Sequence, residues 1–335
     1  MFIDVDGVLK MGHKPIQNAR KGIEIIQKLK IPFKILTNDG GDSEKEKALK
    51  YSKILQLKKP FSPNDIVLCH SPMKQQLQIF SKKDMFKVPL IIGQGNIPSL
   101  MNYYGVKRSI TCEEYALIYY KMLPINIIKE ILNKREQAVK KLKQRLKVSN
   151  LFPPIAINGI FQISDVLRWE IPVQLCSDLL ISSNGIPGTK KRREDKFSVS
   201  YHLSFDEIQY KDSFVLPRFS GGACFQSLQH LFKLLYKYDF PYIIYGKPSK
   251  LIFNYAKEEI VKNYPYILIS NYYMIGDNPE IDIKGANECG IHSILVSTGV
   301  FDHKKNKNDL KYPAKVVVKD FYEAINYILL RENII

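Results

Sequence analysis

Short apolar runs alternate with segments of helical periodicity near the start of the chain. Residues 17–30 place isoleucine and leucine side chains at near-helical spacing, which predicts an amphipathic helix. An apolar run follows at 33–37, then a second helical segment at 43–56, then another apolar run at 66–70. This strand–helix–strand alternation predicts a parallel sheet joined by right-handed crossovers.

The same alternation returns near the C-terminus. Four apolar or aromatic runs predict strands at 242–247, 272–277, 292–299 and 315–320. Helices are predicted at 250–262 and, after the last strand, at 321–332. Both ends of the chain therefore contribute to one sheet, and the predicted fold class is α/β with a Rossmann-like parallel-sheet core.

The stretch between these two regions is long enough to form a domain of its own. The predicted division is a core made of residues 1–85 and 236–335, with an inserted α/β domain at 86–235. Strands of the inserted domain are predicted at 88–93, 155–161, 179–185 and 197–202. Its helices are predicted at 96–105, 126–147, 169–180 and 223–237. Such a domain is expected to close over the active edge of the core and exclude water.

Polar clusters follow four of the predicted core strands at their carboxyl ends. They are Asp4-Val5-Asp6-Gly7, Thr37-Asn38, Gly246-Lys247 and Gly276-Asp277-Asn278. Ligands of open parallel sheets bind beyond the carboxyl ends of the strands, so these clusters are expected to form one pocket. Carboxylates gathered there repel one another unless a cation lies between them, and hard oxygen ligands suit Mg²⁺. The lysine and the N–H groups of the glycine turns suit a phosphoryl group.

Each cluster has a simpler explanation when it is taken alone. The DxDG stretch could be a loop capped by aspartate, and a glycine–lysine pair by itself is no signal. Four clusters in this order, each after a strand, are much more specific and indicate a functional site.

The formal net charge of +17 admits a nucleic-acid partner or an anionic substrate. Lysine far outnumbers arginine, the usual residue for bidentate base or phosphate contacts, and no nucleic-acid-binding motif is visible. The charge is therefore interpreted as a coding bias, and nucleic acid is not an expected partner. No run of about eighteen apolar residues predicts a membrane span, so no membrane partner is expected. The five scattered cysteines form no CxxC pair, which indicates free thiols and argues against a zinc site.

The chain starts with no cationic leader and no apolar signal stretch, which predicts a cytoplasmic protein. Met1-Phe2-Ile3 is nevertheless a short lead into a buried strand, which usually has about five residues. An upstream segment could be missing from this sequence, and a targeting peptide within it would make the protein mitochondrial.

The four clusters resemble the four motifs of the haloacid dehalogenase (HAD) phosphohydrolases. The matching stretches are DVDGVL, LTND, GKPS and GDNPEIDIKGAN. The resemblance implies that Asp4 is the nucleophile and Asp6 the general acid/base. It also implies that Thr37 and Lys247 contact the transferring phosphoryl group, and that Asn38 orients Asp4 or the phosphoryl oxygens.

The same resemblance implies a Mg²⁺ site. Asp4 and Asp277 would coordinate the metal, Asp6 would add its backbone carbonyl, and Asp282 would support the metal through hydrogen bonds or water. The implied reaction is hydrolysis of a small phosphorylated metabolite through an aspartyl-phosphate intermediate. Asp39 departs from the second motif, and it is predicted to point away and cap the following helix together with Ser43.

Six further stretches, spread over nearly the whole chain, resemble one branch of the class IIA HAD phosphatases, which carry a C2-type α/β cap. The branch is that of the cat eye syndrome critical region protein, also called haloacid dehalogenase-like hydrolase domain-containing protein 5. The matching stretches are 70-HSPMK-74, 93-GQG-95, 168-RWEIPVQL-175, 183-SNGIPG-188, 217-PRFSGG-222 and 298-TGVF-301. The match makes Arg218, Ser220 and Gly221 candidate substrate-binding residues, the alternative being a helix N-terminus with a surface arginine. Caps of this class often pair, which makes a homodimer through the cap one candidate oligomeric state.

Two functions of different classes stay open on this sequence. The first is a Mg²⁺-dependent phosphohydrolase of a small phosphorylated metabolite. The second is a HAD-fold binding or scaffold protein whose active site is weak or vestigial. The complete set of four clusters favours the first.

Overall fold

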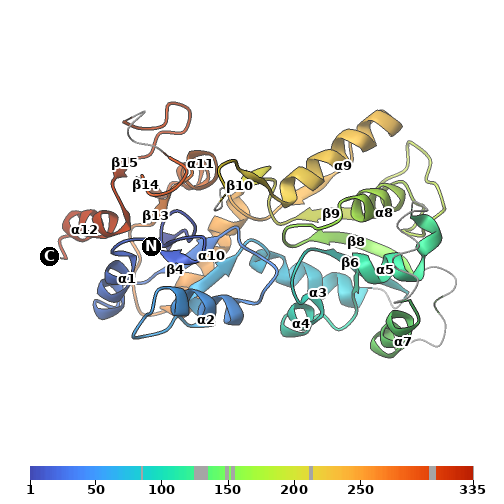
Figure 1. The fold of residues 1–335 in the computed structure, drawn as a ribbon, viewed down its shortest axis with the longest axis horizontal. Coiled ribbons are helices and arrows are strands. Elements are labelled where there is room, and N and C mark those ends of the chain that lie inside the picture. Colours follow the sequence, from blue (N-terminus) through green and yellow to red (C-terminus); the bar gives the residue numbers. More distant parts are fainter. Residues whose placement is uncertain are drawn as a thin grey trace.

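The computed structural model describes residues 1–83, 86–123, 135–147, 151, 155–210, 214–301 and 307–334. These residues form two larger β-sheets, each built from parallel strands with helices on both faces (Figure 1). The chain builds three strands of the first sheet, then the second sheet, and then returns to complete the first. The parallel-sheet α/β fold predicted from the sequence is confirmed.

The first sheet, here called the core sheet, has six parallel strands in the order β15-β14-β13-β1-β4-β5. They are β1 (Phe2–Ile3), β4 (Lys34–Thr37), β5 (Ile66–Leu68), β13 (Tyr273–Gly276), β14 (His292–Val296) and β15 (Val316–Val318). In the central strand, Ile3 lies opposite Ile35 of β4 and Ile275 of β13. The Asp4 N–H donates to the Ile275 carbonyl at 3.0 Å, which extends the pairing by one residue. Because the strands are parallel and in register, the residues that follow β1, β4 and β13 emerge at one edge.

Helices cover both faces of the core sheet. One face carries α1 (Ala19–Lys28), α2 (Glu44–Ile54) and α12 (Phe321–Arg331), and the other carries α10 (Lys250–Asn263) and α11 (Lys284–Glu288). Successive side chains of β1 point to opposite faces, so Ile3 packs with the first group and Phe2 with the second. Burial on both faces explains why these strands read as continuous apolar runs.

The second sheet has five parallel strands in the order β12-β9-β8-β6-β7. They are β6 (Lys87–Ile92), β7 (Ile110–Thr111), β8 (Ala156–Gln162), β9 (Ser200–Leu203) and β12 (Tyr242–Ile244). One face packs against α5 (Cys112–Ile118), α7 (Arg135–Leu146), α8 (Glu170–Leu180) and α9 (Gly221–Tyr236). The other face packs against α3 (Lys74–Lys83) and α4 (Ile97–Tyr103). Two hairpins complete the described strands, β2 (Lys10–Met11) with β3 (Lys14–Pro15) and β10 (Gln209–Tyr210) with β11 (Arg218–Phe219).

The strand predicted at 242–247 belongs to the second sheet, and its assignment to the core sheet was wrong. β12 pairs with β9, and the Tyr245 and Gly246 N–H groups extend this pairing to the carbonyls of Leu203 (2.9 Å) and Ser204 (2.6 Å). The chain then enters α10, which packs on the core sheet. An apolar run shows that a strand is buried, but it does not show which sheet buries it. Residues 245–247 therefore form a crossing between the two sheets, while the predicted domain division stays a prediction.

The strand predicted at 179–185 does not form. Leu179 and Leu180 belong to the last turn of α8, and turns follow them. Both leucines are fully buried, so the apolar run that suggested a strand is the inner side of a helix end. The predicted helix at 126–147 is represented by α7, and residues 126–134 lie outside the described residues.

The predictions on the cysteines and on membrane-spanning segments can be compared with the structure. All five cysteines are free thiols, as predicted. Among the described residues, no helix combines the length and the apolar character that crossing a bilayer would require.

Candidate active site

Three buried carboxylates meet at the edge of the core sheet where its strands end. Asp4 follows β1, Asp277 follows β13, and Asp282 lies in the π-helical turn Pro279–Ile283. One oxygen from each carboxylate lies within 4.8 Å of the other two. The three residues are at most 7% exposed, so their charges are poorly screened by water. The first and fourth sequence clusters therefore form one site.

Lys247 lies between two of these carboxylates. Its Nζ donates to Asp4 Oδ1 at 2.7 Å and to Asp282 Oδ1 at 2.6 Å. Burial alone would lower the pKa of Lys247, but the adjacent Asp282 and Asp4 raise it above its ordinary value. The lysine is therefore held as a cation against the carboxylates.

A single lysine does not neutralise three carboxylates. Burial raises the pKa of Asp4 to about 7, although Lys247 opposes this shift. Burial also raises the pKa of Asp277, and the charges of Asp282 and Asp4 add to the effect. The site therefore has excess negative charge that a divalent cation would relieve.

Asp282 fixes the turn after β13 and the ammonium group of Lys247. Its Oδ2 accepts hydrogen bonds from the N–H groups of Asp277 (3.2 Å) and Asn278 (3.1 Å), while its Oδ1 accepts from Lys247. Both carboxylate oxygens are thus engaged by protein donors. This arrangement fits the supporting role that the sequence resemblance implied for Asp282.

Glycines leave the space that Asp277 occupies. A Cβ atom at Gly7 would lie 2.3 Å from Asp277 Oδ2, and one at Gly299 would lie 1.8 Å from the same oxygen. Gly7 also has a φ of +76°, in the left-handed region that favours glycine. The Val300 N–H donates to Asp277 Oδ2 at 2.6 Å and fixes the carboxylate in this space. Gly7, in the first motif, is therefore required both for the turn and for close packing.

The second motif contributes through Thr37 and Asn38. Thr37 ends β4 at the same edge as Asp4, is buried, and accepts a hydrogen bond from the Asp39 N–H at 3.1 Å. The Asn38 side-chain amide pairs with the Lys247 backbone in both directions, donating to its carbonyl at 3.0 Å and accepting from its N–H at 2.9 Å. The prediction that Asn38 orients Asp4 or phosphoryl oxygens stays a prediction. Asn38 holds the crossing segment that carries Lys247.

Asp6 lies apart from the three buried carboxylates. Its side chain is 56% exposed and forms an ion pair with Lys10 of the β2–β3 hairpin. Its carboxylate is not one of the group that lies within 4.8 Å. Its access to solvent suits the predicted role of general acid and base.

Asp39 does not cap the following helix, and that prediction was wrong. Its two oxygens accept hydrogen bonds from Lys47 Nζ and Tyr51 Oη, both at 2.7 Å. Burial opposes ionisation, but Lys47 and Tyr51 hold the pKa of Asp39 below its ordinary value. The cap is supplied by Ser43, which forms a capping box with Glu46.

The candidate substrate-binding residues of the second sheet have partners of their own. The Ser220 hydroxyl and the Gly221 N–H both donate to Asp165 Oδ1, at 3.1 Å and 2.7 Å. The N-terminus of α9 is thus already occupied by a carboxylate of the protein. Arg218 is exposed, lies over the Phe214 ring and donates to the Leu216 carbonyl. Among the described residues these contacts do not join the three residues to the carboxylate site, so their substrate role stays a prediction.

Glu207 was missed by the sequence analysis. It lies in the loop between β9 of the second sheet and β10 of the β10–β11 hairpin. Burial raises its pKa to about 8, Lys247 opposes this shift, and the charges of Asp282 and Asp4 add to it. The loop begins beside Lys247, because the Ser204 carbonyl accepts a hydrogen bond from the Gly246 N–H at 2.6 Å. No sequence motif marks Glu207. Its place near the site depends on how the second sheet packs against the core sheet, and the sequence around Glu207 does not encode that packing.

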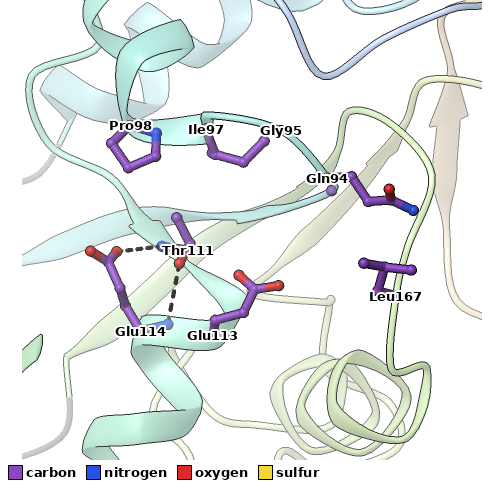
Figure 2. A pocket seen from close by; sticks show the side chains of 9 residues that line it. Gln94, Gly95, Ile97, Pro98, Thr111, Glu113, Glu114 and Leu167 are labelled. Carbon is purple, nitrogen blue, oxygen red and sulfur yellow. Dashed lines mark hydrogen bonds between the residues drawn. The ribbon is translucent and has the colours of Figure 1, made fainter. Parts of the chain in front are cut away.

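A separate cavity of about 430 Å³ lies in the second-sheet region. Figure 2 shows Gln94, Thr111, Glu113, Glu114 and Leu167 around it. The dashed lines mark the capping box of α5, in which Thr111 and Glu114 exchange hydrogen bonds of 2.9 Å and 3.2 Å. Among the residues that the structure describes, two glutamates and no cationic side chain line this cavity, so this lining is unsuited to a phosphate group.

Family comparisons match the two chain segments that build the core sheet. A family model described as haloacid dehalogenase-like hydrolase matches residues 1–107. A second model, described as HAD-hydrolase-like, matches residues 244–324. All residues of the carboxylate and lysine site lie within these two ranges.

Two curated yeast proteins are similar over nearly the whole chain. A cardiolipin synthase (CMP-forming)/mitochondrial hydrolase fusion protein of Schizosaccharomyces pombe is 30% identical over 335 residues, covering 98% of this chain and 52% of the relative. A mitochondrial hydrolase of Saccharomyces cerevisiae is 24% identical over 355 residues, covering 97% of this chain and 94% of the relative. The chain thus spans about half the length of the fission yeast relative.

Solved structures share the fold at low sequence identity. A 4-nitrophenylphosphatase of Thermotoga maritima has a TM-score of 0.61 and 14% identity, covering 97% of this chain and 95% of that one. A glycerol phosphate phosphatase of Mycobacterium tuberculosis, crystallised with magnesium, has a TM-score of 0.59 and 15% identity, covering 97% and 75%. The two family matches, the shared fold and the converging motif residues agree. The chain belongs to the haloacid dehalogenase-like hydrolases.

Proposed function

We propose that the chain is a Mg²⁺-dependent phosphohydrolase that cleaves a small phosphorylated metabolite through an aspartyl-phosphate on Asp4. The observation that carries the proposal is the contact of Lys247 Nζ with Asp4 Oδ1 at 2.7 Å, beside the carboxylate of Asp277. A carboxylate nucleophile, a fixed cation and a metal-binding acid are the groups that phosphoryl transfer requires in one place.

The donor set of the site fits Mg²⁺. Asp4 and Asp277 present hard carboxylate oxygens, and burial raises the pKa of both, so a bound cation would favour their ionised forms. Asp282 is held by its own hydrogen bonds and would orient these ligands. When bound, the ion offsets the negative charge of the phosphoryl oxygens. The magnesium complex of the Mycobacterium tuberculosis phosphatase supports the same choice of metal.

The protein groups can carry out both halves of the reaction. In the first, Asp4 attacks phosphorus as the ester P–O bond breaks, and Asp6 gives its proton to the leaving oxygen. In the second, Asp6 takes a proton from water as that water attacks phosphorus, which releases inorganic phosphate and restores Asp4. Lys247 stays protonated throughout and balances charge on the transferring group. Asp6 turns from Lys10 toward the leaving group to perform these transfers.

The second sheet would act as the cap, with residues 86–235 inserted between the core segments 1–85 and 236–335. Support comes from Glu207, a residue of the second-sheet region whose pKa responds to Lys247, Asp282 and Asp4. A loop at this place narrows the space beside the phosphate, which favours small substrates and keeps water from the intermediate. Arg218, Ser220 and Gly221 would act at the outer side of this loop.

The names of both yeast relatives include the word mitochondrial. We infer a mitochondrial location for this chain in place of the cytoplasmic one predicted from its first residues.

Removal of the metal tests the proposed function directly. We expect p-nitrophenyl phosphate hydrolysis to stop in EDTA and to return when Mg²⁺ is added in excess. A rate that is unchanged by EDTA would contradict the proposal. Mg²⁺ binding without turnover of any phosphate ester would instead support the binding or scaffold alternative.

The stabilising effect of Mg²⁺ is expected to grow with pH. In the metal-free protein the pKa of Asp4 is raised from 3.8 to about 7. The folded state therefore holds the Asp4 proton more tightly than the unfolded state does. This contribution to folding stability is fully present below about pH 4 and is lost as the pH rises through 7. The metal binds the deprotonated carboxylates, so at about 100 times its Kd it adds about 2.7 kcal/mol of stability only at higher pH. Thermal denaturation should show a Mg²⁺-dependent rise in Tm on the order of 5 °C at pH 8 and a much smaller rise at pH 5.5. An equal or larger rise at pH 5.5 would refute this assignment of charge.

A further inference from the structure

The loop between α10 and β13 presents apolar side chains to solvent. It reads YPYILIS from residue 264 to residue 270. Tyr266 is 99% exposed and Leu268 is 93% exposed, and Ile267 between them is also exposed. Three consecutive large apolar residues exposed in one loop are unusual for a surface that meets only water.

The loop is held firmly at both ends. On one side the Asn263 side chain donates to the Asn64 carbonyl at 3.1 Å, and the Tyr264 N–H donates to the Ile260 carbonyl at 3.0 Å. On the other side Ile269 packs against the α10 side of the core sheet. The outward position of Tyr266 and Leu268 is therefore fixed by the fold around them.

Other exposed apolar residues lie at the same edge of the core sheet. Helices of a parallel sheet end where the next strand begins, so the ends of α1, α10 and α12 share this edge. They carry Leu29, Leu330 and Ile334, all exposed. The Asn271 side chain, between the loop and β13, donates to Glu332 Oε1 at 3.0 Å, which links the loop to the end of α12. We call this surface the basal face, and it comprises Lys28, Leu29, Lys30, Lys58, Lys59, Tyr266, Ile267, Leu268, Leu330, Arg331 and Ile334.

Cations surround the apolar residues of the basal face. Lys28 and Lys30 flank Leu29 in the sequence. Lys58 and Lys59 lie close to the end of α1, because the Gln27 side chain donates a hydrogen bond to the Lys59 carbonyl at 3.1 Å. All four lysines are exposed. Glu24 of α1 is paired with Arg20, and Asp65 and Glu332 lie in neighbouring segments, so cations still outnumber acids on this surface. Apolar side chains at the centre of a basic surface suit the boundary of an anionic bilayer.

We propose that the basal face binds the surface of an anionic phospholipid membrane. Tyr266, Ile267 and Leu268 enter the headgroup region, and the lysines contact lipid phosphates. A second copy of the chain fits less well, because a symmetric contact would place these lysines against their own equivalents. The expectation of no membrane partner rested on the lack of a spanning segment, which does not bear on a loop that lies at the interface.

This orientation has a consequence for the substrate. The basal face lies where the core strands begin, and the carboxylate site lies where they end. On a membrane the site therefore faces away from the lipid and receives its substrate from solution. The inference goes beyond the proposed phosphohydrolase activity and can hold without it.

Vesicle sedimentation tests the proposal. The chain is expected to sediment with phosphatidylcholine vesicles that contain phosphatidylglycerol, to stay in solution with phosphatidylcholine alone, and to be released by high salt. The double variant Tyr266→Ser/Leu268→Ser should lose at least about tenfold in partition, which is about 1.4 kcal/mol. Its rate on a soluble phosphate ester should equal that of the wild type, with and without vesicles.

Leu310→Ser is the matched control. Leu310 is 92% exposed, and its neighbour Lys311 contacts Glu280 beyond the opposite end of β13. This variant should sediment as the wild type does. The proposal is overturned if the wild type does not sediment with anionic vesicles. It is also overturned if the double variant binds these vesicles with the same affinity as the Leu310 variant does. It is also overturned if the double substitution changes the oligomeric state by light scattering, because the basal face would then be a contact between copies.

Discussion

Replacement of Asp4 by asparagine is expected to lower kcat by about 10⁴- to 10⁶-fold, the range seen when a catalytic nucleophile is removed. The amide keeps the size and shape of the side chain but cannot attack phosphorus as an anion. Steady-state hydrolysis of p-nitrophenyl phosphate at saturating Mg²⁺ measures the loss.

A carboxylate at the other edge of the core sheet provides the control. Asp65 accepts a hydrogen bond from the Ser62 N–H at 2.7 Å and has no contact with the carboxylate site. Asp65→Asn should reduce stability slightly and leave kcat within about twofold of the wild type, as expected when no contact with the reacting groups is lost. If the Asp4 variant keeps a tenth or more of the wild-type rate, Asp4 is not the nucleophile.

Replacement of Lys247 by methionine is expected to lower kcat by about 10²- to 10³-fold, the usual cost of removing one group that stabilises transition-state charge. The substitution also leaves Asp4 and Asp282 buried without their cation. Breaking a buried ion pair in this way costs about 3–5 kcal/mol of folding free energy. Circular dichroism melts and kinetics on the same preparations separate the two effects, and Mg²⁺ should recover part of the stability but not the rate.

Lys34 offers a second buried lysine for comparison. It lies on β4 of the core sheet, is 1% exposed, and donates to the Asn64 carbonyl. Lys34→Met should also lower the melting temperature, while its kcat should stay near the wild-type value. Equal kcat losses in the two lysine variants would show that the effect of Lys247 is structural.

The sequence was sufficient to predict the centre of the site. Asp4 and Asp277 each follow an apolar run, and parallel strands necessarily end at one edge. The resemblance to the HAD motifs added Asp282, whose carboxylate accepts a hydrogen bond from the N–H of Asp277 across the π-helical turn. These contacts are local, or they follow from strand direction alone, so a pattern of residues can reveal them.

Contacts that depend on how the two sheets meet could not be predicted. Asn38 pairs with the Lys247 backbone only because the crossing segment returns from the second sheet at that point. Glu207 approaches the site through a loop of the second sheet, and nothing in its neighbours along the chain marks it. Asp39 accepts hydrogen bonds from Lys47 and Tyr51, on one face of α2, and not from the N–H groups at the start of that helix. In each case several partners were chemically equivalent, and tertiary packing selected one.

The crossing at residues 245–247 makes catalysis sensitive to the relative position of the two sheets. Tyr245 and Gly246 are bonded to β9 and the segment after it, whereas the side chain of Lys247 reaches the core sheet. A small shift between the sheets would pull the ammonium group from Asp4 while both hydrophobic interiors stayed intact. We therefore expect substitutions that loosen the contact between the sheets to lower the rate of hydrolysis without unfolding the protein.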